Sequence, residues 1–578
     1  MKNRFSLALV ALIILALSLP VFVLAQQKRD QSNTSAGTRT TNKSDLPPSA
    51  PGRRPRSRAP SNATTAVSQD FSEALSVIQQ HYIDGNKLDF NNVYKSSIIG
   101  MLRTLDPHSN YFDKEEFDEM KTDQRSEYFG IGASIQNYVT GDQVETYVSG
   151  TFKNAPAYRA GLRFGDRIDA VDGVSMHGKL SAEVRDKIRG PRGSEVKITI
   201  THAATGKSNV VDITRDAVPQ PSVPDFYMIR SGVGYIDMTR GFNYDTAQGL
   251  QEALDILHAR GMNSLVLDLR NNPGGFLDQA IHVAETFLPA GQPILTQKGR
   301  NGMNDRTYTS ANGDPDRTPL VILVNDYTAS ASEIVAGAMQ DHDRALIVGQ
   351  TSFGKGLVQS IIPLEYGAGL TLTSAKYYTP SGRLIQRDYS DGGFYNYIYR
   401  GGTLRDSKTD QGRPAGPASR TDTGRTVYGG GGITPDELVK PATITGIQDR
   451  LRQPAFFFAR EVANGRIAGF DKYKVDRPIE FGHDLEANDL PINDALYAAF
   501  KDYIAKEPTW KNLVPQLDRN RTFIESQLRF QLATAAYGTV TALQVLTKQD
   551  PQVARAIDVT PRARDLAMAA MRARMQQP

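Results

Sequence analysis

The sequence predicts a multidomain α+β protein, and three observations lead to this fold class. The chain has 578 residues, which suggests about three or four domains. Hydrophobic residues make up 39% of it, enough for apolar cores. The apolar residues change along the chain from helical spacing to short β-runs, and then to alternating strands and helices. We therefore expect an N-terminal helical segment, a β-rich domain, an α/β layered core and a mostly helical C-terminal region.

Residues 1–25 have the pattern of an export signal. Lys2 and Arg4 precede the apolar run 5–24, and Val23-Leu24-Ala25 fits a cleavage site. A run of about 20 apolar residues is also long enough to span a bilayer if it is not cut. We therefore expect an exported protein of the periplasm or cell envelope, with residues 5–24 acting as a cleaved signal or a membrane tether.

Residues 26–66 are predicted to be a disordered basic linker, because large apolar side chains are nearly absent. Residues 1–66 hold 10 Lys and Arg against 2 Asp, whereas residues 67–578 hold 57 Lys and Arg against 61 Asp and Glu. The linker's arginine cluster is interrupted by prolines and has no interleaved aromatic residue. We therefore expect no nucleic-acid partner.

Residues 67–128 and 129–216 differ in their apolar spacing. Helical spacing in the first range predicts an N-terminal helical segment, with apolar positions at Phe71, Leu75, Ile78, Val93, Ile98, Leu102 and Leu105. Short β-runs in the second range predict a compact β-rich domain, with strands at Val144–Val148, Ile168–Val171 and Val196–Ile200.

Residues 217–443 alternate between strand and helix patterns, which predicts α/β layering. The expected strands are Val233–Met238, Ser264–Leu269, Leu320–Val324 and Ala345–Val348. The expected helices are Ala247–Ala259, with Asp245 as N-cap, Phe276–Phe287 and Ala331–Met339. A Gly-rich insertion is expected at about 391–432, and residues 444–578 are predicted to be mostly helical.

Ser330 is the candidate nucleophile. An apolar strand leads into small residues at the start of a helix, so the Ser330 hydroxyl is expected near the positive end of the helix dipole. This position also favours a developing oxyanion. Ser330 and Glu333 equally match an S-x-x-E capping box, which requires no catalysis. Spacing alone leaves both interpretations open.

Lys355 is the candidate general base. It lies between Gly354 and Gly356 in an otherwise apolar stretch. The unperturbed pKa of lysine is about 10.4, so Lys355 can accept a proton near neutrality only if burial lowers that pKa. A lysine on a surface turn is the alternative.

Three other motifs overlap this region. Gly349 to Lys355 reads G-x-x-x-x-G-K, but Gly356 stands where a phosphate-binding loop has Ser or Thr. Ser352 to Lys355 reads S-x-x-K without the S-D-N and K-T-G partners of penicillin-binding enzymes. His342 lies between two aspartates, yet it is expected near the far end of the Ser330 helix, which favours a solvated or capping histidine over a Ser/His/Asp triad.

The composition and histidine spacing exclude several classes of site. The chain has no cysteine, which excludes disulfides, Cys-based zinc and iron-sulfur sites, and a cysteine nucleophile. None of its 8 histidines falls in an H-E-x-x-H pattern. We therefore expect no catalytic metal.

From about residue 70 to 440 the chain resembles the carboxyl-terminal processing protease family, also called tail-specific proteases. Several motifs occur in the family's order: Leu105-Asp106-Pro107-His108-Ser109, Asn154-Ala155-Pro156-Ala157, Ala160-Gly161-Leu162-Arg163-Phe164-Gly165-Asp166, Asp268-Leu269-Arg270-Asn271-Asn272-Pro273-Gly274-Gly275, Asn325 to Glu333, Phe353 to Gln359, and Gly430-Gly431-Gly432-Ile433-Thr434-Pro435-Asp436.

The resemblance implies a serine/lysine dyad of Ser330 and Lys355, which lie 25 residues apart as in the family. Thr328 replaces a serine of the family's S-A-S-A-S-E segment, outside the dyad. Gln359 matches the glutamine that helps to orient the lysine. The family also has an oxyanion hole of backbone N–H groups, which we place at Gly275 and Ala331.

Residues 129–216 resemble the PDZ domain of these proteases. A PDZ domain pairs a substrate tail with a sheet edge and binds its terminal carboxylate on loop N–H groups. Phe129, Gly130, Ile131 and Gly132 are the candidate loop, although the family more often has an extra glycine there. Glycines that only form a turn are the alternative.

The sequence therefore predicts an exported serine endopeptidase that binds the free, apolar carboxyl terminus of a protein or peptide and cleaves it through an acyl-enzyme, without a cofactor. The family often forms dimers or larger assemblies, so a homo-oligomer or an adaptor is a further expected partner. The alternative is a catalytically silent PDZ scaffold that binds carboxyl termini in the cell envelope.

Overall fold

A computed structural model describes residues 62–123, 127–390, 397 and 416–576. The chain divides into two compact units, residues 1–88 and 89–578. In the first unit the structure describes α1 (Asn62–His81) and the short 3-10 helix η1 (Gly85–Lys87). The predicted signal and most of the predicted linker lie outside the described residues. Within the described ranges, no helix is long and apolar enough to cross a membrane.

The second unit begins with two helices separated by a short strand. They are α2 (Phe90–Arg103), β1 (Asn110–Phe112) and α3 (Lys114–Asp123). Asp89 caps α2, because its carboxylate accepts hydrogen bonds from the N–H groups of Asn91 and Asn92. The predicted helical segment is therefore interrupted at the Asp106-Pro107 turn, where the chain enters a β-sheet.

The β-rich domain is built on a sheet with the strand order β3-β4-β5-β7-β8, to which β6 adds at β5. Its strands are β3 (Ala133–Thr140), β4 (Gln143–Thr151), β5 (Arg167–Val171), β6 (Val174–Ser175), β7 (Glu195–Thr201) and β8 (Ser208–Thr214). The helices α4 (Pro156–Arg159) and α5 (Ser181–Ile188) complete it, and β2 (Glu127–Gly130) pairs with β9 (Asp216–Pro219) at its entrance. The predicted strands of this domain are all present.

The α/β core contains a six-stranded sheet in the order β10-β11-β12-β15-β16-β21, in which β10 alone is antiparallel to its neighbour. The strands are β10 (Asp225–Arg230), β11 (Val233–Asp237), β12 (Ser264–Asp268), β15 (Leu320–Val324), β16 (Ala345–Gly349) and β21 (Glu437–Leu438). The helices that follow them are α6 (Thr246–Ala259), α7 (Leu277–Phe287) and α8 (Ala331–Asp341).

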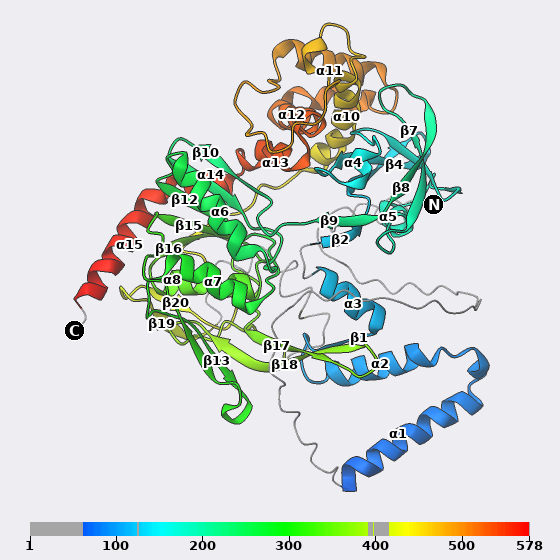
Figure 1. The fold of residues 1–578 in the computed structure, drawn as a ribbon. Coiled ribbons are helices and arrows are strands. Elements are labelled where there is room, and N and C mark those ends of the chain that lie inside the picture. The colour runs from blue at the N-terminus through cyan, green and yellow to red at the C-terminus, as the bar shows by residue number, and fades with distance from the viewer. Residues whose placement is uncertain (1–61, 124–126, 391–396, 398–415, 577–578) are drawn as a thin grey trace, which may run out of the picture. The chain divides into compact units, whose positions relative to one another are not determined.

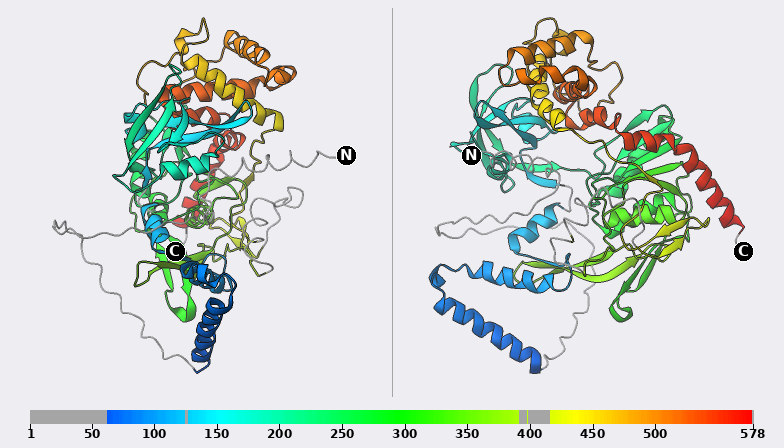
Figure 2. Two further views of the ribbon diagram at one scale, coloured as in Figure 1. Left: turned by 90° about the vertical axis from the view of Figure 1, so that its right-hand side faces the viewer. Right: turned by 180° about the vertical axis from the view of Figure 1, so that it is seen from behind.

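Alternate residues of these strands point to opposite sides of the sheet, so each face presents apolar side chains. Helices cover both faces. Figure 1 shows α6, α7 and α8 on one face, and the view from behind in Figure 2 shows the red helices α14 (Pro551–Asp558) and α15 (Thr560–Met575) on the other. The predicted layering is confirmed. Asp245 does stand at the N-cap of α6, but its carboxylate accepts from the Ser222 hydroxyl at 3.0 Å and caps no N–H.

A second sheet, which the sequence did not reveal, lies beside the core in the order β1-β18-β13-β14, with β17 paired to β18. Its strands after β1 are β13 (Pro293–Gly299), β14 (Arg306–Thr309), β17 (Leu357–Pro363) and β18 (Gly369–Tyr378). Lys355 is placed by this sheet, because it lies two residues before β17, whereas Ser330 is placed by the first sheet.

The C-terminal region is helical, as predicted. After the hairpin of β19 (Ala418–Arg420) and β20 (Thr426–Tyr428), it contains α10 (Gly446–Ala463), α11 (Asp494–Lys506), α12 (Arg521–Tyr537) and α13 (Thr539–Thr547), followed by α14 and α15. Helices α10 to α12 share an apolar cluster with Tyr138, Tyr147 and Phe164 of the β-rich domain. The C-terminal region therefore packs against both the β-rich domain and the α/β core.

Candidate active site

Ser330 lies at the turn between β15 and α8, as predicted. Its backbone has φ 57° and ψ −115°, a conformation that an L-residue rarely adopts and that costs on the order of 1–3 kcal/mol. The turn is tied to its surroundings by the buried Thr328, whose hydroxyl donates to the carbonyl of Leu269 at 2.8 Å. The fold therefore maintains a strained backbone at the residue that carries the candidate hydroxyl.

Glu333 joins the turn of Ser330 to the turn of Lys355. Its fully buried carboxylate accepts from the N–H groups of Ser330 at 2.9 Å, Gly354 at 2.7 Å and Lys355 at 2.8 Å, and from the Ser352 hydroxyl at 2.5 Å. Burial raises the pKa of Glu333, and these four hydrogen bonds oppose the shift. Glu333 therefore caps α8, as the S-x-x-E spacing predicted, and also holds the lysine turn.

This wider role of Glu333 was not predicted from the sequence. The signal for it is a glutamate among small and apolar residues, whose burial demands several hydrogen bonds.

Lys355 has the altered acidity that a general base requires. Burial lowers the pKa of Lys355 to about 8, although the negative charges of Glu333 and Asp106 oppose the shift. Near pH 8 about half of the lysine is therefore a neutral amine that can accept a proton. The surface-turn alternative does not describe this side chain.

The motif at residues 105–109 lies beside the lysine turn. Asp106 accepts from the N–H and hydroxyl of Ser109, and the Ser109 hydroxyl in turn accepts from the N–H of Thr373 in β18 at 3.1 Å. Burial, with the positive charge of Lys355, lowers the pKa of His108 to about 3. The imidazole is therefore neutral at physiological pH, and its Nε2 contacts the Tyr397 hydroxyl at 2.8 Å.

Of the two residues predicted to form the oxyanion hole, Gly275 lies in the loop between β12 and α7, and Ala331 is the first residue of α8. Gly274 has φ 92°, and a methyl group there would lie 2.7 Å from the carbonyl oxygen of Ala329 and 2.8 Å from the N of Ala331. Gly275, with φ 151°, follows directly. Within the described residues, the N–H groups of Gly275 and Ala331 donate to no protein acceptor.

Gln359 lies in β17, and its side-chain amide donates to the Thr373 hydroxyl at 3.2 Å. This contact is within the second sheet, so the structure brings Gln359 to β18 and gives it no hydrogen bond to Lys355 among the described residues.

The competing motifs lack their structural contexts. The G-x-x-x-x-G-K segment is followed by strand β17, whereas a phosphate-binding loop leads into a helix. The Ser352 hydroxyl is used for structure, since it donates to Glu333 and accepts from the N–H of Ile433 at 2.6 Å. His342 is the C-cap of α8, as expected, but it is 4% exposed and pairs with Asp422, so it is not solvated.

Of the four residues of the candidate carboxylate loop, Phe129 and Gly130 end strand β2 and pair with β9, and only Ile131 and Gly132 form the connection to β3. Ile131 is buried in the core of the β-rich domain, and Gly132 has φ 72°. A methyl group on Gly132 would lie 2.3 Å from the Ala155 Cβ, so the turn requires glycine. The following strand β3 is at an edge of its sheet, where an added strand could pair.

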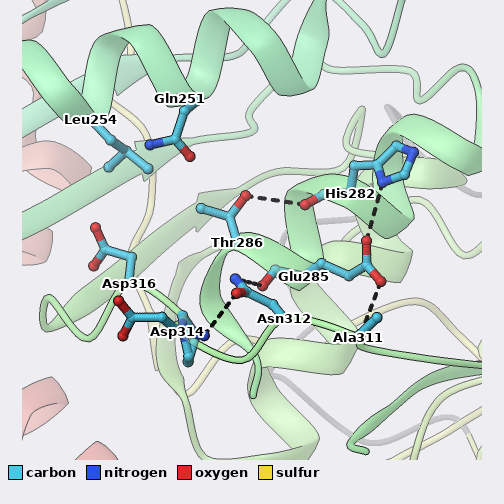
Figure 3. Close-up of a pocket in the computed structure, with 10 residues that line it drawn as sticks. Gln251, Leu254, His282, Glu285, Thr286, Ala311, Asn312, Asp314 and Asp316 are labelled. Carbon is cyan, nitrogen blue, oxygen red and sulfur yellow. Dashed lines mark hydrogen bonds and ion pairs between the residues drawn. The ribbon is translucent and has the colours of Figure 1, made fainter. Parts of the chain in front are cut away.

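A separate polar cavity of about 490 Å³ lies between α6, α7 and the segment after β14. Figure 3 shows Glu285 contacting His282 and the Ala311 N–H at its rim. None of the predicted site residues lines it. Among the described residues, no cluster of three or more His, Asp or Glu side chains could hold a metal ion.

Two family models match the chain. The model described as peptidase family S41 matches residues 232–392, and a PDZ domain model matches residues 148–201. The S41 match contains Ser330, Glu333 and Lys355.

Curated relatives match about half of the chain. The carboxy-terminal-processing protease of Bartonella bacilliformis is 39% identical over 303 residues, which are 52% of this chain and 68% of that protein. A Staphylococcus aureus protein named "Probable CtpA-like serine protease" is 36% identical over 301 residues, 59% of its own length. Among solved structures, the photosystem II D1 C-terminal processing protease is 25% identical, with a TM-score of 0.34 over 64% of this chain and 92% of that one.

Proposed function

The chain belongs to the carboxy-terminal-processing protease family, peptidase family S41, and on that premise we propose that it is an exported serine endopeptidase with a Ser330/Lys355 dyad. Its PDZ domain binds the free carboxyl terminus of a protein substrate, and the dyad cleaves that substrate through an acyl-enzyme. The observation that carries the proposal is a partly buried lysine whose pKa is lowered to about 8, linked through Glu333 to a serine with a strained backbone.

Each step of the reaction uses a group at this site. The neutral Lys355 amine takes the proton of the Ser330 hydroxyl while the serine oxygen attacks the scissile carbonyl carbon. The N–H groups of Gly275 and Ala331 bind the resulting oxyanion. The Lys355 ammonium then protonates the departing amine, the C–N bond breaks, and Ser330 remains acylated. Water then attacks the ester carbonyl while the neutral lysine takes its proton. The lysine returns that proton to the serine oxygen as the ester C–O bond breaks, which releases the new carboxyl terminus and frees Ser330.

Substrate recognition is assigned to the PDZ domain. The substrate tail would add to the β3 edge, and its carboxylate would bind the N–H groups of the loop at residues 129–132. An apolar terminal side chain would suit the apolar core residues around Ile131. Export is assigned to residues 1–25, where the basic and apolar segments follow the order of a signal.

A cleavage survey tests this function. An unfolded reporter protein is incubated with the wild-type chain and with Ser330→Ala, and the products are identified by mass spectrometry for several C-terminal residues. We expect cleavage by the wild type, strongest for apolar termini with a free carboxylate, and no cleavage by Ser330→Ala. An uncut reporter that binds with equal affinity to both chains would favour the silent scaffold.

A further inference from the structure

The side chain of Tyr377, in β18, contacts the backbones of the two dyad residues. It is 1% exposed, and it belongs to the apolar core that also contains α8. Its hydroxyl has one proton, which it shares between the carbonyl oxygen of Lys355 at 2.8 Å and that of Ser330 at 3.1 Å. Burial raises the pKa of Tyr377 well above its usual value, so the phenol keeps its proton and remains a donor.

The dyad needs such a connection because its two residues belong to different sheets. Ser330 follows β15 of the six-stranded sheet, and Lys355 precedes β17 of the second sheet. Two buried side chains join their turns. Glu333 accepts from the N–H groups of both residues, whereas Tyr377 donates to the carbonyls of both.

We propose that Tyr377 is a positioning residue that, together with Glu333, fixes the Ser330 hydroxyl relative to the Lys355 amine. This inference rests on the proposed dyad. Each dyad residue then has both its N–H and its carbonyl fixed by a side chain shared with the other, which limits rotation of both backbones. Tyr377 does not touch the substrate and transfers no proton.

The strained backbone of Ser330 gives this contact a specific purpose. The Ser330 carbonyl also accepts from the N–H groups of Glu333 at 2.9 Å and Ile334 at 3.0 Å. These bonds belong to α8, so they fix the carbonyl relative to the helix alone. The phenol comes from the second sheet, which carries Lys355, so its contact fixes the Ser330 carbonyl relative to that sheet as well.

The test replaces the hydroxyl and keeps the ring, in the full chain. For Tyr377→Phe we expect kcat per active serine to fall by about 10- to 100-fold with KM within about twofold, because small displacements of reacting groups are costly. Active serines are counted by labelling with a fluorophosphonate. A purely structural role would reduce the number of labelled serines and leave the rate per labelled serine unchanged.

A matched control is Tyr473→Phe. Tyr473 is also 1% exposed, and its hydroxyl donates to the carbonyl of Pro491 in the C-terminal helical region. This variant should lose similar stability and keep its kcat. If Tyr377→Phe does not fold, replacement of Tyr377 by 4-fluorophenylalanine fills the same space without a proton to donate, and we expect the same loss of rate.

Two results separate the possible failures. An unchanged rate per labelled serine in either Tyr377 variant would overturn the positioning role while leaving the dyad in place. Cleavage by Ser330→Ala at the wild-type rate would instead overturn the proposed function.

Discussion

At the scale of single residues, the chemistry depends on two ionisable side chains, the fully buried Glu333 and the partly buried Lys355. Desolvation disfavours the charged form of both, but Glu333 accepts four hydrogen bonds and Lys355 can lose its proton. The acidity of Lys355 therefore determines the pH at which the proposed enzyme works.

We expect kcat/KM to rise about tenfold per pH unit below pH 8 and to level off above it. A lysine whose pKa is lowered to about 8 is mostly protonated at pH 6 and mostly neutral at pH 9, and only the neutral amine accepts the serine proton. A pH–rate profile measures this midpoint. A rate that still rises at pH 10 would show an unperturbed lysine.

Replacement of Asp106 should move this midpoint to lower pH. The negative charge of Asp106 raises the pKa of Lys355, so Asp106→Asn removes a stabilising partner of the ammonium. The same pH–rate profile measures the shift, and a midpoint at higher pH would contradict the assigned electrostatics.

Asp225 of β10 should make stability fall as pH rises. Burial raises the pKa of Asp225 to about 7, so the folded state binds this proton more tightly than the unfolded chain does. Its contribution is greatest below pH 4 and is lost as pH rises through 7. We expect Asp225→Asn, which can still accept from Gln544, to gain about 1–3 kcal/mol at pH 8 and nothing at pH 4. Urea unfolding at both pH values measures this. An equal effect of Asp225→Asn on the free energy of unfolding at pH 4 and at pH 8 would contradict the prediction.

The positions of Ser330 at a strand-to-helix turn and of Lys355 at a glycine-flanked turn could be predicted from the sequence because their motifs are local. The capping role of Glu333 could be predicted for the same reason, but its contacts with the lysine turn and those of Tyr377 with both turns could not. Three of the four hydrogen bonds of Glu333 reach residues 19 to 22 positions away, and those of Tyr377 reach 22 and 47 positions back. Such contacts exist only after two sheets have come together.

At the scale of elements, the loop between β12 and α7 has to fit closely against the Ser330 turn. Asn272 joins them, because its carbonyl accepts from the N–H of Ala329 at 2.9 Å and from the Ser332 hydroxyl at 3.2 Å. Two residues later, Gly274 leaves no room for a side chain, since an added Cβ would lie 2.7 Å from the carbonyl oxygen of Ala329.

Gly274→Ala should therefore reduce kcat by at least about 100-fold. The new methyl group would collide with the carbonyl of Ala329, and φ of 92° is strained for alanine. Gly261→Ala is the matched control, because Gly261 has φ 84° but nothing within 4 Å of the added methyl group. Steady-state kinetics should show normal kcat for Gly261→Ala, and equal kcat in the two variants would contradict the close fit.

Strands β11, β12, β15 and β16 of the six-stranded sheet could be predicted to within about two residues, since runs such as Leu320–Val324 are wholly apolar and buried on both faces. Its two edge strands, β10 and β21, were not predicted. Strands β17 and β18 were missed because most of their residues are half-buried and many are polar. Strand β18 pairs with β17 on one side and with β1, which lies more than 200 residues earlier in the chain, so this sheet cannot be predicted from local sequence.

At the scale of the whole molecule, the C-terminal helices pack against the PDZ domain. Tyr138 stacks on Phe456 of α10 with ring centroids 4.2 Å apart, and Arg460 donates to the carbonyl of Gly165 at 2.8 Å. The sequence of this region did not predict such a contact, because its apolar residues indicate that the helices are packed against a partner but not which domain that partner is. We infer that α10 to α13 and the PDZ domain move as one body.

A disulfide between positions 150 and 539 should form without loss of activity. A Cβ at Gly150 in β4 would lie 3.7 Å from the Cβ of Thr539 in α13, within the range for a disulfide. The chain has no other cysteine, so Gly150→Cys with Thr539→Cys gives a single crosslink. We expect oxidised and reduced forms to cleave the reporter at equal rates. A large loss on oxidation, reversed by reductant, would show that the PDZ domain has to leave the helices.

The central claim is that Ser330 is the nucleophile and that Lys355 activates it. The most direct measurement is the rate of fluorophosphonate labelling at pH 8, with the modified residue identified by mass spectrometry of digested protein. We predict a single adduct on Ser330 in the wild type, and at least a 100-fold slower adduct in Lys355→Ala, since an unassisted hydroxyl is a weak nucleophile. Labelling at another residue, or labelling of Ser330 at the wild-type rate in Lys355→Ala, would contradict the dyad.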